Sequence, residues 1–294
     1  MTTHGIHYID ALFTSTSACC VTGLVSVDTA TVFTLKGKFI IMLLIQFGGI
    51  NIVSFATFFA TFSSGSTGLK NQSILKDMLS TDELSSTRTL LREVIFFSIG
   101  IELIGAIAMY AYWSYHGTLN GQGATIFYSV FHSVSAFNNA GFCLWTNNIF
   151  DSTIRHQYFI QMVIMALVFF GGLGFMAMQD IFNPQRILMR RKTKWKKLKL
   201  SSSVALQTSI ALIIIGAVFF FFLEQNKSIA GESRIGQICA SFFQSVSART
   251  AGFNSVDFSL IGQPTLIILI ILMFIGASPG STGGGIKTTT FFVL

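Results

Sequence analysis

Long apolar segments alternate with shorter mixed segments along the whole chain. A helix needs about 20 apolar residues to cross a bilayer. Five segments carry one charged residue at most and approach or exceed this length: Phe39–Phe62, Val94–Trp113, Gln157–Met178, Ser203–Leu223 and the run that starts at Pro264. Because such runs are typical of membrane-spanning helices, the pattern predicts an all-α membrane protein that crosses the bilayer several times.

A shorter helical pattern that leads to a glycine occurs three times. The segments align without gaps at Phe13–Ala18, Phe131–Ala136 and Phe243–Ala248. The glycines that follow lie 118 and 111 residues apart, and they are Gly23, Gly141 and Gly252. We predict a repeated unit: a span, a short pore helix, a glycine loop and a second span. The expected pore helices are Ile9–Ala18, Ala124–Ala136 and Gly236–Ala248. Three unrelated half-buried loops are the alternative, against which the near-equal spacing argues.

The repeat divides the chain into units. We predict a first unit at 1–62 without an opening span, a cytoplasmic connection at 63–92, a second unit at 93–182, a basic cytoplasmic loop at 183–202 and a third unit at 203–294. No fourth unit follows, so we expect a fragment that lacks a first span and a fourth unit. Closure of a pore by several associated chains is the alternative.

Composition and charge support this organisation. The chain is 51% hydrophobic and 11% charged, whereas soluble domains carry about 25% charged residues. Twelve of the 19 Lys and Arg lie in the connections 63–92 and 183–202. This bias predicts a multi-pass cell-membrane protein with both connections in the cytoplasm. The net charge of +7 therefore indicates contact with anionic lipid headgroups rather than nucleic acid.

The glycine loops indicate a cation pathway. Glycine tolerates left-handed dihedrals and adds no side chain, and non-helical backbone at membrane depth is tolerated where it lines a water-filled cavity. Carbonyl oxygens arranged around an axis replace the hydration shell of a cation, and the C-terminal ends of the pore helices add partial negative charge. Because none of the three loops holds an acidic residue, we predict a carbonyl-lined pore for a monovalent cation.

A glycine-rich stretch interrupts the last apolar segment. It contains Pro279 and five glycines, and a helix interior loses about 1 kcal/mol per Gly and 3 per Pro relative to Ala. We therefore predict a loop in mid-membrane that acts as a gate, with a passive kink as the alternative. A phosphate-binding loop fits poorly, because Ile286 separates the last glycine from the lysine. The expected gate residues are Gly276, Ser278, Pro279, Gly280, Ser281, Thr282, Gly283, Gly284, Gly285 and Lys287.

Four segments resemble the membrane subunit of the Ktr/Trk potassium uptake family: Ala11–Leu24, Asn138–Phe142, Arg249–Phe253 and Ala277–Thr290. The resemblance covers nearly the whole chain. It implies a potassium-channel-like fold with four pore-loop units around one ion path, potassium as substrate, no bound cofactor, a homodimer, and gating by a cytosolic nucleotide-binding ring. Carried over residue by residue, it implies the filter residues Val21, Thr22, Gly23, Asn139, Ala140, Gly141, Thr250, Ala251 and Gly252.

Other function classes are weaker. A secondary cation symporter with discontinuous helices predicts inverted repeats, whereas the three units here run in the same order; a sodium-selective relative also stays open. No enzyme is expected, because the sequence lacks a nucleophile–base or metal constellation. Glu102 is either functional, as an acid inside a span, or the partner of a neighbouring helix. Arg249 is expected to point away from the pore and to bond carbonyl groups behind the loop.

Overall fold

The computed structural model describes residues 2–3, 5–63, 87–119, 121–183, 187–189 and 198–294. Most of the predicted connections 63–92 and 183–202 therefore lies outside the described residues. The α-helices are α1 (Tyr8–Cys19), α2 (Thr29–Val32), α3 (Leu35–Ser63), α5 (Thr87–His116), α6 (Gln122–Phe137), α7 (Tyr158–Leu173), α8 (Phe175–Phe182), α10 (Leu200–Glu224), α11 (Arg234–Ala248), α12 (Gln263–Phe274) and α13 (Thr288–Val293). Two short 3-10 helices, Asn148–Phe150 and Phe258–Leu260, lie in loops. All regular elements of the described part are helical, which confirms the predicted all-α class.

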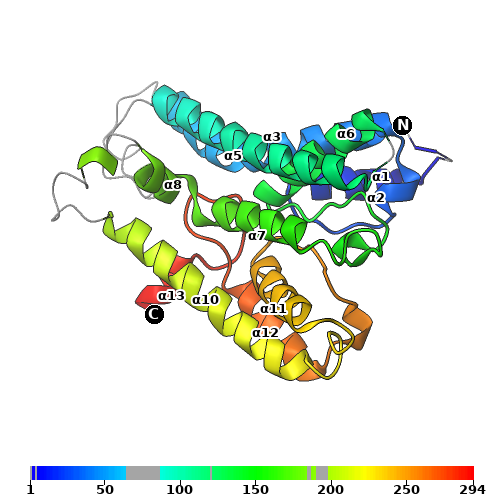
Figure 1. Ribbon diagram of the computed structural model, residues 1–294. Coiled ribbons are helices and arrows are strands. Elements are labelled where there is room, and N and C mark those ends of the chain that lie inside the picture. Colours follow the sequence, from blue (N-terminus) through cyan, green and yellow to red (C-terminus); the bar gives the residue numbers. More distant parts are fainter. Residues whose placement is uncertain (1, 4, 64–86, 120, 184–186, 190–197) are drawn as a thin grey trace.

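The helices follow the repeat that the sequence predicts. The short helices α1, α6 and α11 are the three pore helices, and α3, α7 and α12 follow them as the second spans. Helices α5 and α10 are the opening spans of the second and third units. Figure 1 shows α3, α5 and α6 on one side of the molecule, α10, α11 and α12 on the other, and α7 between them.

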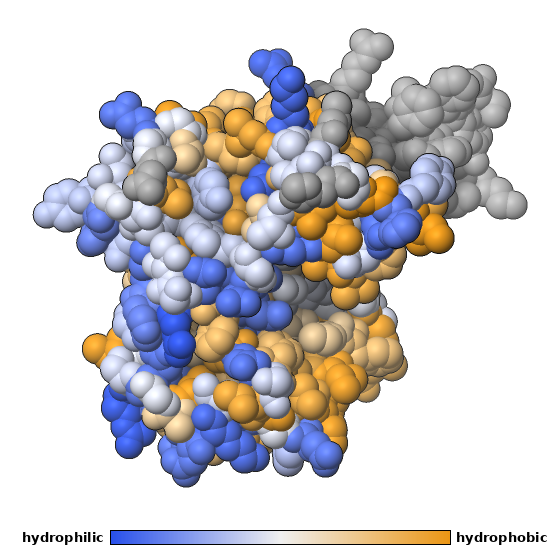
Figure 2. Space-filling view, turned by 90° about the vertical axis from the view of Figure 1, so that its right-hand side faces the viewer, coloured by the Kyte–Doolittle hydropathy of each residue, from blue (hydrophilic) through white to orange (hydrophobic). Residues whose placement is uncertain are grey.

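Two helices in the described residues are long and apolar enough to cross a membrane by themselves. They are Arg92–His116 within α5 and Leu200–Glu224. The pair α7 and α8 qualifies as a third, bent span. Figure 2 shows the end of the molecule near α1 and α2, where hydrophilic residues run down the middle of the face and hydrophobic residues gather along its right-hand side. This separation suits a polar end that emerges from an apolar belt.

The second span of the middle unit is bent. We expected a span over Gln157–Met178, and this region holds two helices: α7 ends at Leu173 and α8 starts at Phe175 after a bend of 105°. Gly174 lies at the bend with φ +83°, and a Cβ there would lie 2.3 Å from the carbonyl oxygen of Pro279. The span breaks because a distant loop packs against it at this glycine.

Buried clusters join neighbouring units. Ile45 of α3 packs in one cluster with Phe131 of α6 and with Phe142, which follows the second pore helix. A second cluster brings Phe137 of the middle unit together with Phe243 of the third. Since burying each large apolar side chain contributes about 1.5–3 kcal/mol, these clusters hold the pore helices of successive units together.

Each complete unit packs its pore helix on its opening span at a glycine. Ser133 Oγ of α6 donates to the carbonyl oxygen of Glu102 at 2.6 Å, and Ser245 Oγ of α11 donates to that of Ile213 at 2.7 Å. A Cβ at Gly105 would lie 2.7 Å from Ser133 Oγ, and one at Gly216 would lie 2.4 Å from Ser245 Oγ. A larger residue at either position would have to push these side chains aside, so glycine favours the close approach of the two helices.

Two alanine substitutions on α5 test this packing. We expect Gly105→Ala to lower the melting temperature, because overpacking a close contact costs about 1–3 kcal/mol. Gly100→Ala is the matched control: its Cβ meets nothing within 4 Å, so it should gain about 0.5–1 kcal/mol from helix propensity. Melting of the detergent-purified protein measures both. Equal shifts in the two variants would contradict a packing role for Gly105.

Candidate ion pathway

The three glycine loops share one backbone conformation. In each loop the glycine has a positive φ, with values of 79° at Gly23, 70° at Gly141 and 77° at Gly252. The residue two positions earlier also has a positive φ; these residues are Val21, Asn139 and Thr250, with φ of 55°, 57° and 74°. Left-handed backbone is costly for branched residues such as valine and threonine. Strain of this kind is typical of functional sites.

A repeated serine supports this conformation. Near the end of each pore helix a serine hydroxyl donates to a carbonyl oxygen just beyond the glycine: Ser17 to Leu24 at 2.6 Å, Ser135 to Phe142 at 2.7 Å and Ser247 to Phe253 at 2.5 Å. The carbonyl oxygens of the same serines accept from the loop N–H groups of Thr22, Ala140 and Ala251 at 2.8–3.0 Å. Each loop is thereby tied to its own pore helix.

The loops lie next to one another in chain order. A Cβ added at Gly23 would lie 2.5 Å from the carbonyl oxygen of Ala140, and one at Gly141 would lie 2.6 Å from that of Ala251. A Cβ at Gly252 would meet only the Cα of Gly141, at 3.8 Å. The three predicted filter segments, far apart in sequence, are therefore brought together, and glycine is needed for the close approach at Gly23 and Gly141.

Residues beside the glycines of the second and third loops are buried. The amide nitrogen of Asn139 is best placed toward the carbonyl oxygens of Ala136 and Val168, 3.2 Å from each. Ala140, Ala251 and Asn139 are each no more than 1% exposed. The loops therefore offer backbone rather than side chains at their point of approach.

The last span breaks where the sequence predicts. Helix α12 ends at Phe274 and α13 starts at Thr288. Between them, Ile275 and Ile286 pair as an isolated parallel bridge, and Ala277 N–H donates to the carbonyl oxygen of Gly284 at 3.1 Å. We refer to residues 276–287 as the intramembrane loop. Its two ends lie side by side, so the chain leaves α12, forms the loop and returns to the same place before α13 begins.

The intramembrane loop docks on the middle unit. Ser278 N–H donates to the carbonyl oxygen of Gly172 at 2.9 Å, and Phe175 N–H donates to that of Gly280 at 3.0 Å. Thr282 Oγ1 lies 3.4 Å from the carbonyl oxygen of Gly171. These contacts fill the bend between α7 and α8, which explains the break that the apolar pattern of this span did not reveal.

The same loop reaches the third glycine loop. A Cβ at Gly283 would lie 2.3 Å from Thr250 Oγ1, so the loop passes directly against a predicted filter residue. Among the loop hydroxyls, Thr282 Oγ1 is the one that faces the middle unit, at Gly171. Ser281 instead bonds its own loop at Ser278, and Ser278 bonds Thr288 at the start of α13. Lys287 Nζ donates to the carbonyl oxygen of Gly283 at 2.9 Å and closes the loop.

Glu102 lies behind the second glycine loop. It is 7% exposed, and its Oε1 accepts from Asn138 Nδ2 at 3.0 Å. The same amide nitrogen lies 3.3 Å from Gln46 Oε1 on α3, which belongs to the first unit. Gly49 of α3 leaves room for Asn138, whose Oδ1 would otherwise lie 1.8 Å from a Cβ. Glu102 therefore contacts Asn138 and is linked through it to α3, as a partner of a neighbouring helix would be, and a functional role for this acid stays a prediction.

Substitution of Glu102 measures the strength of this contact. We expect Glu102→Ala to destabilise the protein by about 1–3 kcal/mol, because it removes a buried acceptor from the Asn138 amide. Glu102→Gln retains an oxygen at that place and should cost much less. Thermal melting in detergent gives the comparison. If glutamine were as harmful as alanine, the acceptor would not be the important feature of this side chain.

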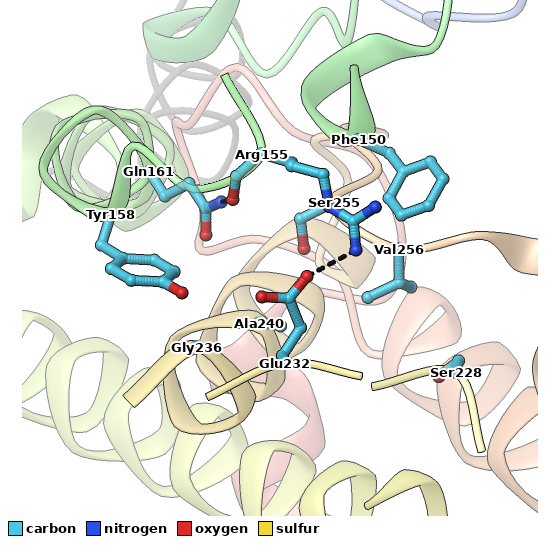
Figure 3. Close-up of a pocket in the computed structure, with 10 residues that line it drawn as sticks. All are labelled: Phe150, Arg155, Tyr158, Gln161, Ser228, Glu232, Gly236, Ala240, Ser255 and Val256. Atoms are coloured by element: carbon cyan, nitrogen blue, oxygen red, sulfur yellow. Dashed lines mark hydrogen bonds and ion pairs between the residues drawn. The ribbon is translucent and has the colours of Figure 1, made fainter. Parts of the chain in front are cut away.

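A small pocket lies between residues of the second and third units. Figure 3 shows that Arg155 and Glu232 meet in it, 2.5 Å apart. The Arg155 guanidinium lies 4.5 Å from the ring centre of Phe150, and His156 Nδ1 lies 3.3 Å from the same glutamate. The ion pair lies in this pocket and joins the two units just before α7 and α11 begin.

Comparisons with known proteins agree with this arrangement. A family model described as TrkH, cation transport protein, matches residues 2–294. The chain is 37% identical over 98% of its length to Ktr system potassium uptake protein B of Vibrio alginolyticus, and 36% identical over 98% to potassium/sodium uptake protein NtpJ of Enterococcus hirae. It spans 62% and 61% of the lengths of these two relatives.

A solved structure shares the fold. The crystal structure of the potassium transporter TrkH from Vibrio parahaemolyticus aligns with a TM-score of 0.73 at 20% identity, covering 98% of this chain and 54% of that chain. With the family match over residues 2–294, this agreement supports the predicted class of repeated pore-loop units. The chain belongs to the TrkH family of cation transport proteins.

Proposed function

We propose that this chain forms part of a membrane pathway for potassium ions. The observation that carries the proposal is the meeting of the three glycine loops, each with the same left-handed backbone at Val21 and Gly23, Asn139 and Gly141, or Thr250 and Gly252. Repeated loops of this kind present backbone carbonyl oxygens to a dehydrated cation. Two relatives with 36–37% identity carry names that include potassium uptake.

In this proposal the three glycine loops bind the ion, and the intramembrane loop of the broken span opens and closes the pathway. A potassium ion exchanges water for carbonyl oxygens of the three loops, with no covalent step, so the protein is not an enzyme. The pore helices α1, α6 and α11 end just before the loops, and their C-terminal ends favour a cation there. The intramembrane loop lies against Thr250 and blocks the pathway until it moves.

Location and partners follow from the same proposal. We infer a multi-pass protein of the cell membrane, with the basic connections on the cytoplasmic side. A homodimer and a cytosolic nucleotide-binding ring are the expected partners. The name of the Vibrio alginolyticus relative supports a multi-component assembly, since it describes protein B of a Ktr system.

A sodium-conducting pathway is the second candidate. It is favoured by the name of the Enterococcus hirae relative, which includes both potassium and sodium. The glycine at Gly23 favours potassium, because a glycine rather than a serine in the first loop resembles the potassium-selective members of the family. A symporter with discontinuous helices is less consistent, since the three units follow one another in the same order.

Ion flux in vesicles tests the proposal. The complete gene product is reconstituted into liposomes loaded with potassium, and efflux is followed into potassium-free buffer, with sodium-loaded liposomes beside them. We expect faster efflux of potassium than of sodium, down the gradient and without a counter-transported solute. Equal rates in protein-containing and protein-free liposomes would reject the proposal, and faster sodium efflux would select the second candidate.

A further inference from the structure

Arg249 is a buried cation directly beside a predicted cation pathway. It follows α11 and immediately precedes Thr250, and it is 7% exposed. No carboxylate among the described residues forms an ion pair with it. A buried charge without a carboxylate is costly unless several polar groups satisfy it. The polar groups that bind the guanidinium therefore indicate the role of this side chain.

The guanidinium joins three segments. One terminal nitrogen lies 3.4 Å from the carbonyl oxygen of Ser209 on α10, and the other lies 3.2 Å from Ser209 Oγ. The second nitrogen also donates to the carbonyl oxygen of Gly276 at 3.0 Å. Gly276 is the first residue of the intramembrane loop. Arg249 thus connects the third glycine loop both to the opening span of its unit and to the start of that loop.

The charge also suits the end of a helix. Gly276 follows α12 by two residues, so the guanidinium lies at the C-terminus, where a cation complements the helix dipole. The opposite end of α12 has a matching anion. Glu224 Oε1 accepts from the N–H of Gly262, the N-cap of α12, at 3.0 Å and from Thr265 Oγ1 at 2.5 Å. Helix α12, the first half of the broken span, therefore has the Glu224 carboxylate at its N-terminal end and Arg249 at its C-terminal end.

The equivalent position of the middle unit has a different partner. Asn138, three residues before its glycine, bonds Glu102 and Gln46, which belong to α5 and α3. Only at the third unit does this position contact the intramembrane loop among the described residues. The arginine therefore does more than support the turn after a pore helix, because an amide performs that task in the neighbouring unit.

We propose that Arg249 couples the intramembrane loop to the third glycine loop. The hydrogen bond from its guanidinium to the carbonyl oxygen of Gly276 holds the loop in the docked position. The same hydrogen bond stabilises the backbone that continues into Thr250 and Gly252. When the loop undocks, this hydrogen bond breaks and the conformation of the third glycine loop relaxes. The inference rests on the proposed function, and it adds that gating and ion preference change together.

A double-mutant cycle tests this coupling. Potassium efflux and the potassium-to-sodium ratio are measured for the complete protein, for Arg249→Met, for deletion of residues 278–285, and for the combination. We expect Arg249→Met to raise efflux about tenfold, the effect of losing one charged hydrogen bond, and to lower the ion ratio. In the deletion background the same substitution should leave efflux unchanged, because no docked loop remains to be released.

Matched variants keep the result interpretable. Arg234→Met changes an exposed arginine at the other end of α11 and should alter neither quantity. Arg249→Lys keeps the charge with fewer donors, and it replaces the methionine variant in the cycle if that protein does not fold; a smaller change in the same direction is then expected. Equal effects of the substitution with and without the intramembrane loop would overturn the coupling. Absence of potassium efflux from every protein would instead reject the proposed function.

Discussion

Replacing Gly141 by alanine is expected to lower potassium efflux at least about tenfold. The backbone of Gly141 has φ +70°, and the new Cβ would lie 2.6 Å from the carbonyl oxygen of Ala251. Left-handed backbone costs an L-residue about 1–2 kcal/mol, and the clash is with backbone that cannot rotate away. Either the second loop or the third must shift, and about 1.4 kcal/mol is sufficient for a tenfold change.

Gly123→Ala is the control for this experiment. Gly123 lies on α6, the pore helix of the same unit, and a Cβ there meets nothing within 4 Å. It should leave efflux unchanged and slightly raise the melting temperature. Potassium efflux in reconstituted liposomes and thermal melting are measured for both proteins. Normal efflux in Gly141→Ala would mean that the close approach of the loops has no part in ion passage.

Deleting residues 278–285 is expected to raise potassium efflux at least about tenfold. The deletion removes the contacts with Gly172, Phe175 and Thr250 that keep the intramembrane loop docked. Undocking costs at least the net strength of two backbone hydrogen bonds, about 0.5–1.5 kcal/mol each. The chain can be rejoined, because Gly276 N–H already donates to the carbonyl oxygen of Ile286 at 3.1 Å.

Two point variants accompany the deletion. Thr282→Val removes the hydroxyl that lies 3.4 Å from the carbonyl oxygen of Gly171, and it should raise efflux by a smaller factor. Gly284→Ala has open space around its new Cβ and should have no effect. Efflux from liposomes is the measurement for all three. If the deletion folded and left efflux unchanged, the loop would be a passive kink rather than a gate.

Local patterns were sufficient to predict most of the fold. The pore helices α6 and α11 lie within two residues of the predicted ranges Ala124–Ala136 and Gly236–Ala248, because each begins and ends in a short polar or glycine-containing segment. The break after Phe274 also follows from local chemistry, since proline and five glycines cannot hold a helix. The expected orientation of Arg249 toward carbonyl groups is confirmed by its contacts with Ser209 and Gly276.

Features that depend on distant contacts were not predictable from one sequence. The segment from Gln157 to Met178 is uncharged, and nothing in its own sequence identifies the position of a bend. The bend at Gly174 depends on residues about a hundred positions later, since it is occupied by Pro279 and Gly280. The contacts of Asn138 with Glu102 and Gln46 are equally non-local, although an acid inside a span indicates that some polar partner is required.

The position three residues before each glycine gives the pathway an uneven electrostatic field. The backbone repeats, but the side chains at this position are a thiol at Cys20, an amide at Asn138 and a guanidinium at Arg249. Coulomb repulsion falls only gradually with distance in a low-dielectric interior. In the proposed pathway we therefore expect a cation to rest off the centre line, displaced from the third unit toward the first two, although the three loops share one backbone conformation.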